Sequence, residues 1–187
     1  MSESRMFGIC PRLYVNPAPA IVTFEMTNLR FEQWVPFPLE KVFRFFADPH
    51  NLPCIMPPET GAKIVDIKFV SSSSESRSAG AGTEIITSFR PIPILPFRQQ
   101  WIALITEFEW NHHFADLQKQ GPFKSWHHRH EFSATTRNGV HGTIVRDVID
   151  FEIGFGVLGK IADKLFVRRT FNHMFAYRRS ALEKLLR

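Results

Sequence analysis

The sequence predicts an α+β domain in which a curved antiparallel sheet of about seven strands wraps around one long C-terminal helix. Three observations lead to this fold class. Turn signals recur at regular spacing between residues 62 and 151, which is the pattern of an antiparallel meander. Two short helical segments precede that meander and suit the plug at one end of a curved sheet. After Gly154 the apolar residues take helical spacing and keep it to Arg187, roughly 30 residues or about 45 Å of helix.

The part of the chain before the meander predicts one strand and two short helices. Residues 31–35 have the composition of a strand end, and Pro38 suits the first turn of the helix that follows. Residues 51–58 predict a second short helix, which a proline pair ends. Residues 1–26 contain three prolines without a sustained period, so we expect an extended or disordered arm before a single domain over 27–187.

Six strands are expected in the meander, each bounded by a turn rich in Gly, Pro, Asn or Ser. Their ranges are 63–70, 82–90, 97–110, 114–120, 124–135 and 140–153. The last two strands flank Asn138-Gly139, a dipeptide typical of a two-residue hairpin turn. We therefore expect these two strands to pair antiparallel, in a register that the turn sets.

Composition indicates one globular domain and argues against several other classes of protein. The 187 residues are 44% hydrophobic and 22% charged, as in ordinary folded domains. The N-terminal apolar run is too short for a signal peptide, no window of 18 residues is fully apolar, and Cys10 and Cys54 have no metal or redox spacing. We therefore expect a cytoplasmic protein with two free thiols. The net charge is +5, but no basic motif accompanies it, so we expect no nucleic-acid binding.

The strand at 124–135 has an unusual face. At strand period Trp126, His128, His130 and Phe132 point to one side, whereas the alternate residues are all polar or charged. Imidazoles on the apolar side of a strand indicate a cavity, a buried carboxylate or a metal at that place.

The next strand supplies a carboxylate for these imidazoles. Four of its residues share the face that we take as inward: Val145, Asp147, Ile149 and Phe151. Counting outward from the hairpin turn places His130 opposite Asp147 and His128 opposite Ile149. A buried aspartate and an imidazole each remove much of the other's desolvation cost.

Three interpretations stay open for His128, His130 and Asp147. They form a satisfied polar cluster that fixes the sheet and helix, they orient a ligand in an apolar cavity, or they bind a metal such as zinc or iron. A fourth metal ligand is not evident, since His112 and His113 lie at a turn, so we expect neither a metal nor another cofactor.

Four further residues are candidates for the same cavity. Trp101 and Phe114 either line it or pack the core, and core packing is the favoured interpretation. Arg169 and Asn172 fall near the apolar stripe of the C-terminal helix, either at its edge or facing the pocket. Other charged residues of this helix are expected to be solvated: Arg168, Arg178 and Lys184.

The loop from Pro91 to Pro96 is unusually apolar for a hairpin tip. Exposed, it would be a lid over a pocket, a partner site or a point of transient membrane contact. The alternative is that it folds back over the helices.

Several motifs together resemble the SRPBCC (START/Bet v 1-like) superfamily over residues 29–187, and most closely its uncharacterised bacterial cyclase/dehydrase-like branch. They are Phe43-x-Phe45-Phe46-x-Asp48-Pro49-x-Asn51-Leu52, Pro57-Pro58, Gly121-Pro122-Phe123, Trp126-x-His128-x-His130-x-Phe132, Gly142-Thr143 with Asp147, and Phe175-x-Tyr177-Arg178-Arg179-x-x-Leu182. The resemblance implies a helix-grip fold with an internal hydrophobic cavity between sheet and C-terminal helix. The long proline-containing arm departs from the family pattern.

The resemblance also implies that the protein binds or carries a small hydrophobic molecule, such as a lipid, polyketide or isoprenoid. We expect Trp126, His128, His130 and Asp147 to contact it, with Trp101, Phe114, Arg169 and Asn172 as further contacts. The alternative is a polyketide cyclase or dehydratase in which His130 and Asp147 form an acid–base pair, although no motif places a nucleophile beside them.

Overall fold

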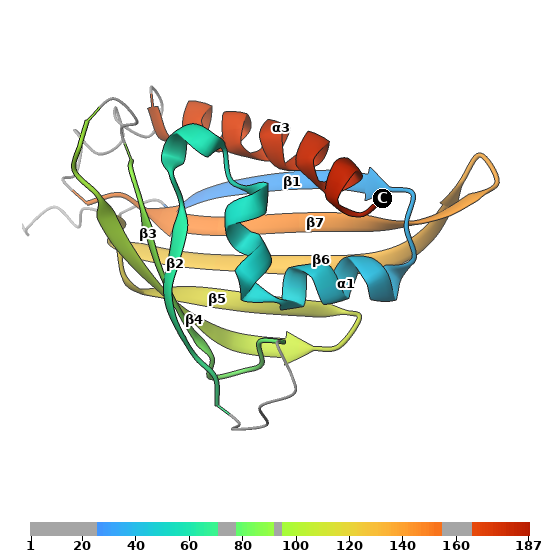
Figure 1. Ribbon diagram of the computed structural model, residues 1–187, viewed down its shortest axis with the longest axis horizontal. Helices are drawn as coiled ribbons and strands as arrows, with labels where there is room; N and C mark the ends of the chain where they lie inside the picture. The colour runs from blue at the N-terminus through green and yellow to red at the C-terminus, as the bar shows by residue number, and fades with distance from the viewer. Residues whose placement is uncertain (1–25, 71–77, 92–94, 155–165) are drawn as a thin grey trace, which may run out of the picture.

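A seven-stranded antiparallel sheet curves around the C-terminal helix in the computed structural model of the protein (Figure 1). The structure describes residues 26–70, 78–91, 95–154 and 166–187. The strands are β1 (Thr27–Val35), β2 (Lys63–Lys68), β3 (Glu84–Phe89), β4 (Gln99–Glu109), β5 (His113–Gln120), β6 (Ser125–Arg137) and β7 (Val140–Glu152). The helices are α1 (Leu39–Ala47), α3 (Arg168–Leu185) and the short 3₁₀ segments η1 (Pro49–Ile55) and η2 (Pro58–Thr60). The predicted fold class is confirmed.

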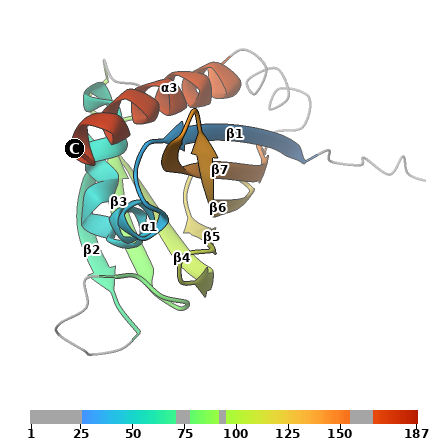
Figure 2. The ribbon, with the colours of Figure 1, turned by 90° about the vertical axis from the view of Figure 1, so that its right-hand side faces the viewer.

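The strand order across the sheet makes the first and last strands neighbours. It runs β1-β7-β6-β5-β4-β3-β2, and α1, η1 and η2 carry the chain from β1 to the opposite edge. Helix α3 packs on β1 and η1, whereas α1 packs on β6 and β7. Figure 2 shows both helices on the concave side of the sheet. The inner face of β1 and β7 therefore lies directly under α3.

The β6–β7 hairpin turn sets the register that the sequence predicts. Asn138 and Gly139 have φ angles of 50° and 76°, the positive values that a type I′ turn requires at both central positions. With this turn fixed, His130 pairs with Asp147 and His128 pairs with Ile149. Both predicted pairs are confirmed.

Two predicted elements differ in detail from the structure. The second helix is a pair of 3₁₀ segments, because Pro53 lies inside the first and Pro58 begins the second, and proline lacks the amide proton that an α-helix needs. Helix α3 is described only from Arg168, so the earlier part of the predicted C-terminal helix lies largely outside the described residues. The arm at 1–25 and the loop tip at 92–94 are also outside them.

Aromatic side chains fill the space between the sheet and the helices in two clusters. The first surrounds Phe43 of α1, which is fully buried and meets Phe114 and Phe132 edge-on. The second lies under α3, where Trp126 stacks on Phe171. Phe114 belongs to the first cluster, and the partly buried Trp101 packs edge-on against Trp126 of the second.

Replacing Phe43 with alanine should lower the free energy of unfolding by about 3–5 kcal/mol, because a ring with no exposed surface would leave a cavity. Urea denaturation measures the change. Phe69→Ala is the control, since Phe69 is 38% exposed and its loss should cost well under half as much. Equal losses for the two variants would contradict this account of the core.

Candidate functional site

The concave faces of the neighbouring strands β6 and β7 carry the residues that the sequence analysis selected as candidates. From Ser125 to Phe132 of β6, buried positions alternate with more exposed ones, so Trp126, His128 and His130 are all buried, each at 7% exposure. On β7 the same alternation buries Asp147 at 4% exposure. The structure thus brings the two imidazoles and the carboxylate together on the concave side of the sheet.

One carboxylate oxygen is the centre of this group. Asp147 Oδ1 lies 2.9 Å from His128 Nε2 and 3.0 Å from Arg178 Nη1, and both are hydrogen bonds. His130 Nδ1 is 2.7 Å from the same oxygen, but it is not aligned for a hydrogen bond. The carboxylate therefore has one full countercharge, from Arg178, and two neighbouring imidazoles.

Arg178 is the main correction to the sequence analysis. It was expected to be solvated, but it is 5% exposed, and its guanidinium lies 4.6 Å above the ring of Phe175. A buried carboxylate requires a buried partner, and the inward stripe of α3 supplies it. The spacing of apolar residues along the helix does predict an inward Arg178. It lies seven and three positions after Phe171 and Phe175 and four before Leu182, and all three of these residues are buried.

The electrostatics of the group keep aspartate ionised and histidine neutral. Burial alone would raise the pKa of Asp147, but the charge of Arg178 and the contacts with the imidazoles outweigh it and hold that pKa well below its usual range. Burial lowers the pKa of His128 to about 4, helped by the nearby His130 and opposed by the bond to Asp147. Burial also lowers the pKa of His130.

A second buried carboxylate, Asp116 of β5, completes the group and was missed by the sequence analysis. It is 9% exposed, pairs with His128 across the strands, and accepts a hydrogen bond of 3.3 Å from Trp126 Nε1. Burial raises the pKa of Asp116 despite the proximity of His128, so burial favours its protonated form. The alternation of side chains along a strand could have predicted that Asp116 points inward, because it lies two residues after Phe114 and shares its face.

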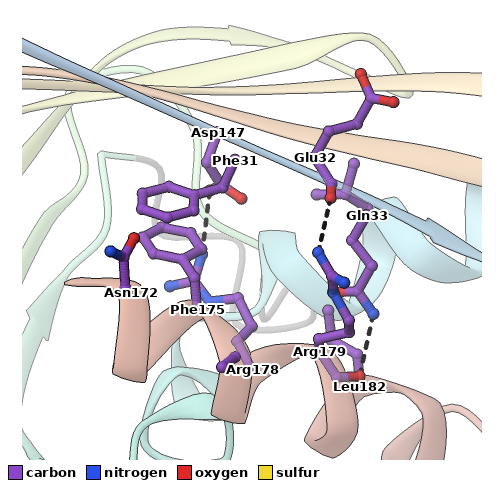
Figure 3. A pocket seen from close by; sticks show the side chains of 11 residues that line it. Phe31, Glu32, Gln33, Asp147, Asn172, Phe175, Arg178, Arg179 and Leu182 are labelled. Carbon is purple, nitrogen blue, oxygen red and sulfur yellow. Dashed lines mark hydrogen bonds and ion pairs between the residues drawn. The ribbon is translucent and has the colours of Figure 1, made fainter. Parts of the chain in front are cut away.

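A cleft of about 300 Å³ opens between β1, β7 and α3, and Asp147 and Arg178 form part of its wall (Figure 3). The rings of Phe31 and Phe175 stack 3.9 Å apart on one side of it. Arg179 and Gln33 lie on the other side, where Gln33 donates a hydrogen bond to the carbonyl oxygen of Arg179. The cleft is mainly apolar with a charged pair at one wall.

Some of the predicted ligand contacts line the cleft, and others do not. Asn172 and Asp147 line it. Other predicted contacts are not among the described residues that line it: Trp101, Phe114, Trp126, His128, His130 and Arg169. Arg169 is exposed on α3, whereas His128 and His130 are buried in direct contact with Asp147. The imidazoles therefore lie behind the carboxylate and outside the lining of the cleft.

The interior group also contains atoms in a spacing that suits a metal. Asp116, His128 and His130 each offer a ligand atom, all within 4.8 Å of one another. However, the Arg178 guanidinium lies 3.0 Å from the carboxylate that contacts both imidazoles, and a cation would be repelled by it. The charge pattern favours the ion pair over a metal at this place.

Comparison with known proteins identifies the architecture. No protein-family model matches the sequence, and no curated protein matches it. Among solved structures, norcoclaurine synthase from Thalictrum flavum, determined as a point mutant with a transition-state analogue, superimposes with a TM-score of 0.59 at 13% identity, covering 88% of this chain and 96% of that one. A START superfamily protein from Mycobacterium smegmatis gives 0.56 at 15% identity, with 85% and 96% covered.

The chain has the START/Bet v 1-like fold. A major latex-like protein from Panax ginseng shares it as well, with a TM-score of 0.57, 14% identity and coverage of 85% and 96%. In the START/Bet v 1-like fold of this chain, the cleft lies between the sheet and the C-terminal helix, where the sequence predicted a cavity.

Arg178→Met should lower the free energy of unfolding by about 3–5 kcal/mol, because it leaves the Asp147 carboxylate buried without its countercharge. Urea denaturation measures the loss. The neighbouring Arg179→Met removes an exposed arginine of the same helix and should cost less than about 1 kcal/mol. Adding Asp147→Asn to Arg178→Met should restore part of the lost stability; no recovery would show that the ion pair is not the cause.

The free energy of unfolding should fall as the pH drops from 7 to 4. His128 titrates near 6.5 in the unfolded chain and near 4 in the folded one, so over this range the unfolded chain binds more protons. The loss from His128 is on the order of 3 kcal/mol. Asp147, whose pKa is also lowered, adds a loss below about pH 4, whereas the raised pKa of Asp116 acts in the opposite direction.

Urea denaturation at pH 7, 5.5 and 4 measures this dependence, and His128→Gln is the comparison because it removes the titrating group. The variant should lose less stability than the parent protein between pH 7 and 4. A parallel loss in both proteins would mean that His128 is not responsible.

Proposed function

We propose that the protein binds a small, largely apolar molecule that carries an oxygen acceptor, in the cleft between β1, β7 and α3. The observation that carries this proposal is the Asp147–Arg178 pair at the wall of a mainly apolar cleft. Ligand sites in proteins typically combine such apolar walls with a few polar groups that fix orientation.

Arg178 lines the cleft, and we assign its guanidinium to the polar contact with the ligand. The Nε atom of this guanidinium is buried and has no hydrogen-bond partner among the described residues. An unsatisfied buried donor costs free energy, on the order of 1–3 kcal/mol, so an acceptor that reaches it gains affinity. A carbonyl, hydroxyl or carboxylate oxygen of a ligand in the cleft is such an acceptor. The polar end of the ligand is therefore assigned to Arg178, with Asp147 holding that guanidinium in place.

The other residues that line the cleft, and its volume, determine which size and polarity of ligand it can hold. Phe31 and Phe175 present ring surface, and Asn172 offers an amide at the side of the cleft. A volume of about 300 Å³ is at the lower end of the range for small-molecule sites, which favours a compact ligand or the end of a longer one. A lipid, polyketide or isoprenoid-like molecule with one oxygenated end meets these requirements.

The other predicted contacts, except Arg169, have a supporting role in this proposal. His128 and His130 contact Asp147, and Trp126 donates a hydrogen bond to Asp116. Trp101 and Phe114 pack in the two aromatic clusters. Arg169 is exposed on the same helix and is not among the described residues that line the cleft, so it has no assigned role in this proposal.

The alternative function is a cyclase or dehydratase in which His130 and Asp147 move a proton. Its support is that a neutral imidazole can accept a proton and that an ionised carboxylate 2.7 Å away stabilises the resulting charge. The reacting atom would have to reach an imidazole that lies behind the carboxylate, so binding is our conclusion.

We also propose that the apolar loop from Pro91 to Pro96 makes transient contact with a membrane. Its support is that Leu95 and, just beyond it, Phe97 are 40% and 48% exposed. None of the helices in the described part of the chain is long and apolar enough to cross a membrane.

Ala176→Trp should reduce the affinity for an apolar anion at least tenfold, because Ala176 lines the cleft and a tryptophan there fills it. The probe is 1-anilinonaphthalene-8-sulfonate, which combines aromatic rings with an acceptor for Arg178, and its fluorescence is titrated with protein. Ser180→Trp is the matched control, since Ser180 is exposed on the same helix.

Native mass spectrometry of the freshly purified protein complements this titration and should detect a bound apolar molecule. Equal probe affinity for Ala176→Trp and Ser180→Trp would place the binding elsewhere and contradict the proposal.

A further inference from the structure

A cluster of three metal-binding side chains lies at the β4–β5 turn, outside the cleft. Its members are Glu109, at the end of β4, and His112 and His113, at the turn and the start of β5. Each offers one ligand atom, and these atoms lie within 4.8 Å of one another. We call these three residues the turn cluster.

Two of the three distances within the turn cluster match those between ligands of a tetrahedral zinc ion, and the third, between the two imidazole nitrogens, is shorter. His112 Nδ1 and His113 Nδ1 are 2.8 Å apart, and they lie 3.3 Å and 3.5 Å from Glu109 Oε2. Zinc binds imidazole nitrogen and carboxylate oxygen at about 2.0–2.1 Å, so two of its ligands in a tetrahedron are about 3.3 Å apart. The triangle of atoms is close to this size before any ion enters it.

A carboxylate in contact with the other ring nitrogen of His113 gives independent support. His113 Nε2 lies 3.3 Å from Glu107 Oε2, and Glu107 accepts a hydrogen bond from Arg129. An ionised Glu107 favours a proton on Nε2 and leaves Nδ1 with a free lone pair, as in histidines that bind metals.

The backbone holds the turn cluster in this geometry. Asn111 has a φ of 61°, which tightens the turn, and the amide of His112 donates to the carbonyl oxygen of Glu109 at 3.0 Å. Glu109 and His113 are directly paired across the two strands. The carbonyl oxygen of His112 accepts from the amide of Phe132 on β6, so the turn is fixed to the sheet.

An ordinary surface ion pair explains this arrangement less well. Exposed pairs contribute little to stability. The two Nδ1 atoms are hydrogen-bonded to each other at 2.8 Å, so at least one of the imidazoles is neutral, with its Nδ1 lone pair available as an acceptor. The planes of the two rings differ by 73°, so the rings meet edge-on, and both Nδ1 atoms lie within 3.5 Å of Glu109 Oε2. Neutral imidazoles that converge beside a carboxylate suit a divalent cation.

We propose that Glu109, His112 and His113 form a zinc-binding site with a fourth position open to solvent. His112 and His113 would bind through Nδ1 and Glu109 through Oε2. The side chains of His112 and Glu109 are 65% and 63% exposed, so the fourth position takes water or a side chain of another molecule. This site does not depend on the ligand-binding function of the cleft.

Isothermal titration of the metal-free full-length protein with zinc chloride tests the proposal, and the absorption of bound cobalt(II) reports a tetrahedral site. We expect one zinc ion per chain. His112→Gln should weaken binding at least tenfold without unfolding the protein, because His112 is largely exposed. His113→Gln should weaken it similarly, and its urea denaturation without zinc checks that the fold is retained.

Two control variants distinguish this site from other sources of zinc affinity. His141→Gln removes an exposed histidine elsewhere in the sheet, and Asp116→Asn removes a ligand from the interior group that also contains His128 and His130. Both should bind zinc as the parent protein does. Binding that is unchanged in His112→Gln and His113→Gln, or that Asp116→Asn abolishes, would overturn the proposal, as would no detectable binding by the parent protein.

Discussion

The buried ion pair between Asp147 and Arg178 is the interaction on which the inner face of this protein depends. A carboxylate at 4% exposure has lost most of its contact with water, and among the described residues the Arg178 guanidinium of α3 is the group that brings it a full opposite charge. The pair joins β7, the neighbour of the edge strand β1, to the helix that the sheet grips. It therefore fixes the position of α3 over β7 and, with that, the width of the cleft beside it.

The two imidazoles add polar contacts to Asp147 but do not replace the charge of Arg178. Both are neutral at neutral pH because burial opposes their charging, so they give Asp147 polar contacts without adding a second positive charge. If both were charged, the group would carry three cations against Asp147, with burial keeping Asp116 protonated. The pattern of two histidines and one arginine is thus suited to a carboxylate that stays ionised in an apolar setting.

Much of the fold and part of the site could be predicted from the sequence, for physical reasons that differ between residues. The Asn138-Gly139 turn allows only a narrow range of backbone angles, so it sets the pairing of His130 with Asp147. Arg178 and Asp116 were not predicted as site residues, because a charged side chain is buried only when a distant segment supplies a partner. Local periodicity marks such positions as inward but does not show the partner.

The β1–β7 pairing has a consequence for how the cleft comes into existence. Asn28 of β1 bonds to Asp150 of β7, a residue 122 positions further along the chain. Closing a loop of that length costs conformational entropy before any contact compensates it, whereas β4 to β7 form from neighbouring hairpins. We expect β1 to join the sheet late, when the hairpins have already assembled. Because β1 forms one wall of the cleft, only protein chains that have finished folding then have a cleft in which a ligand can bind.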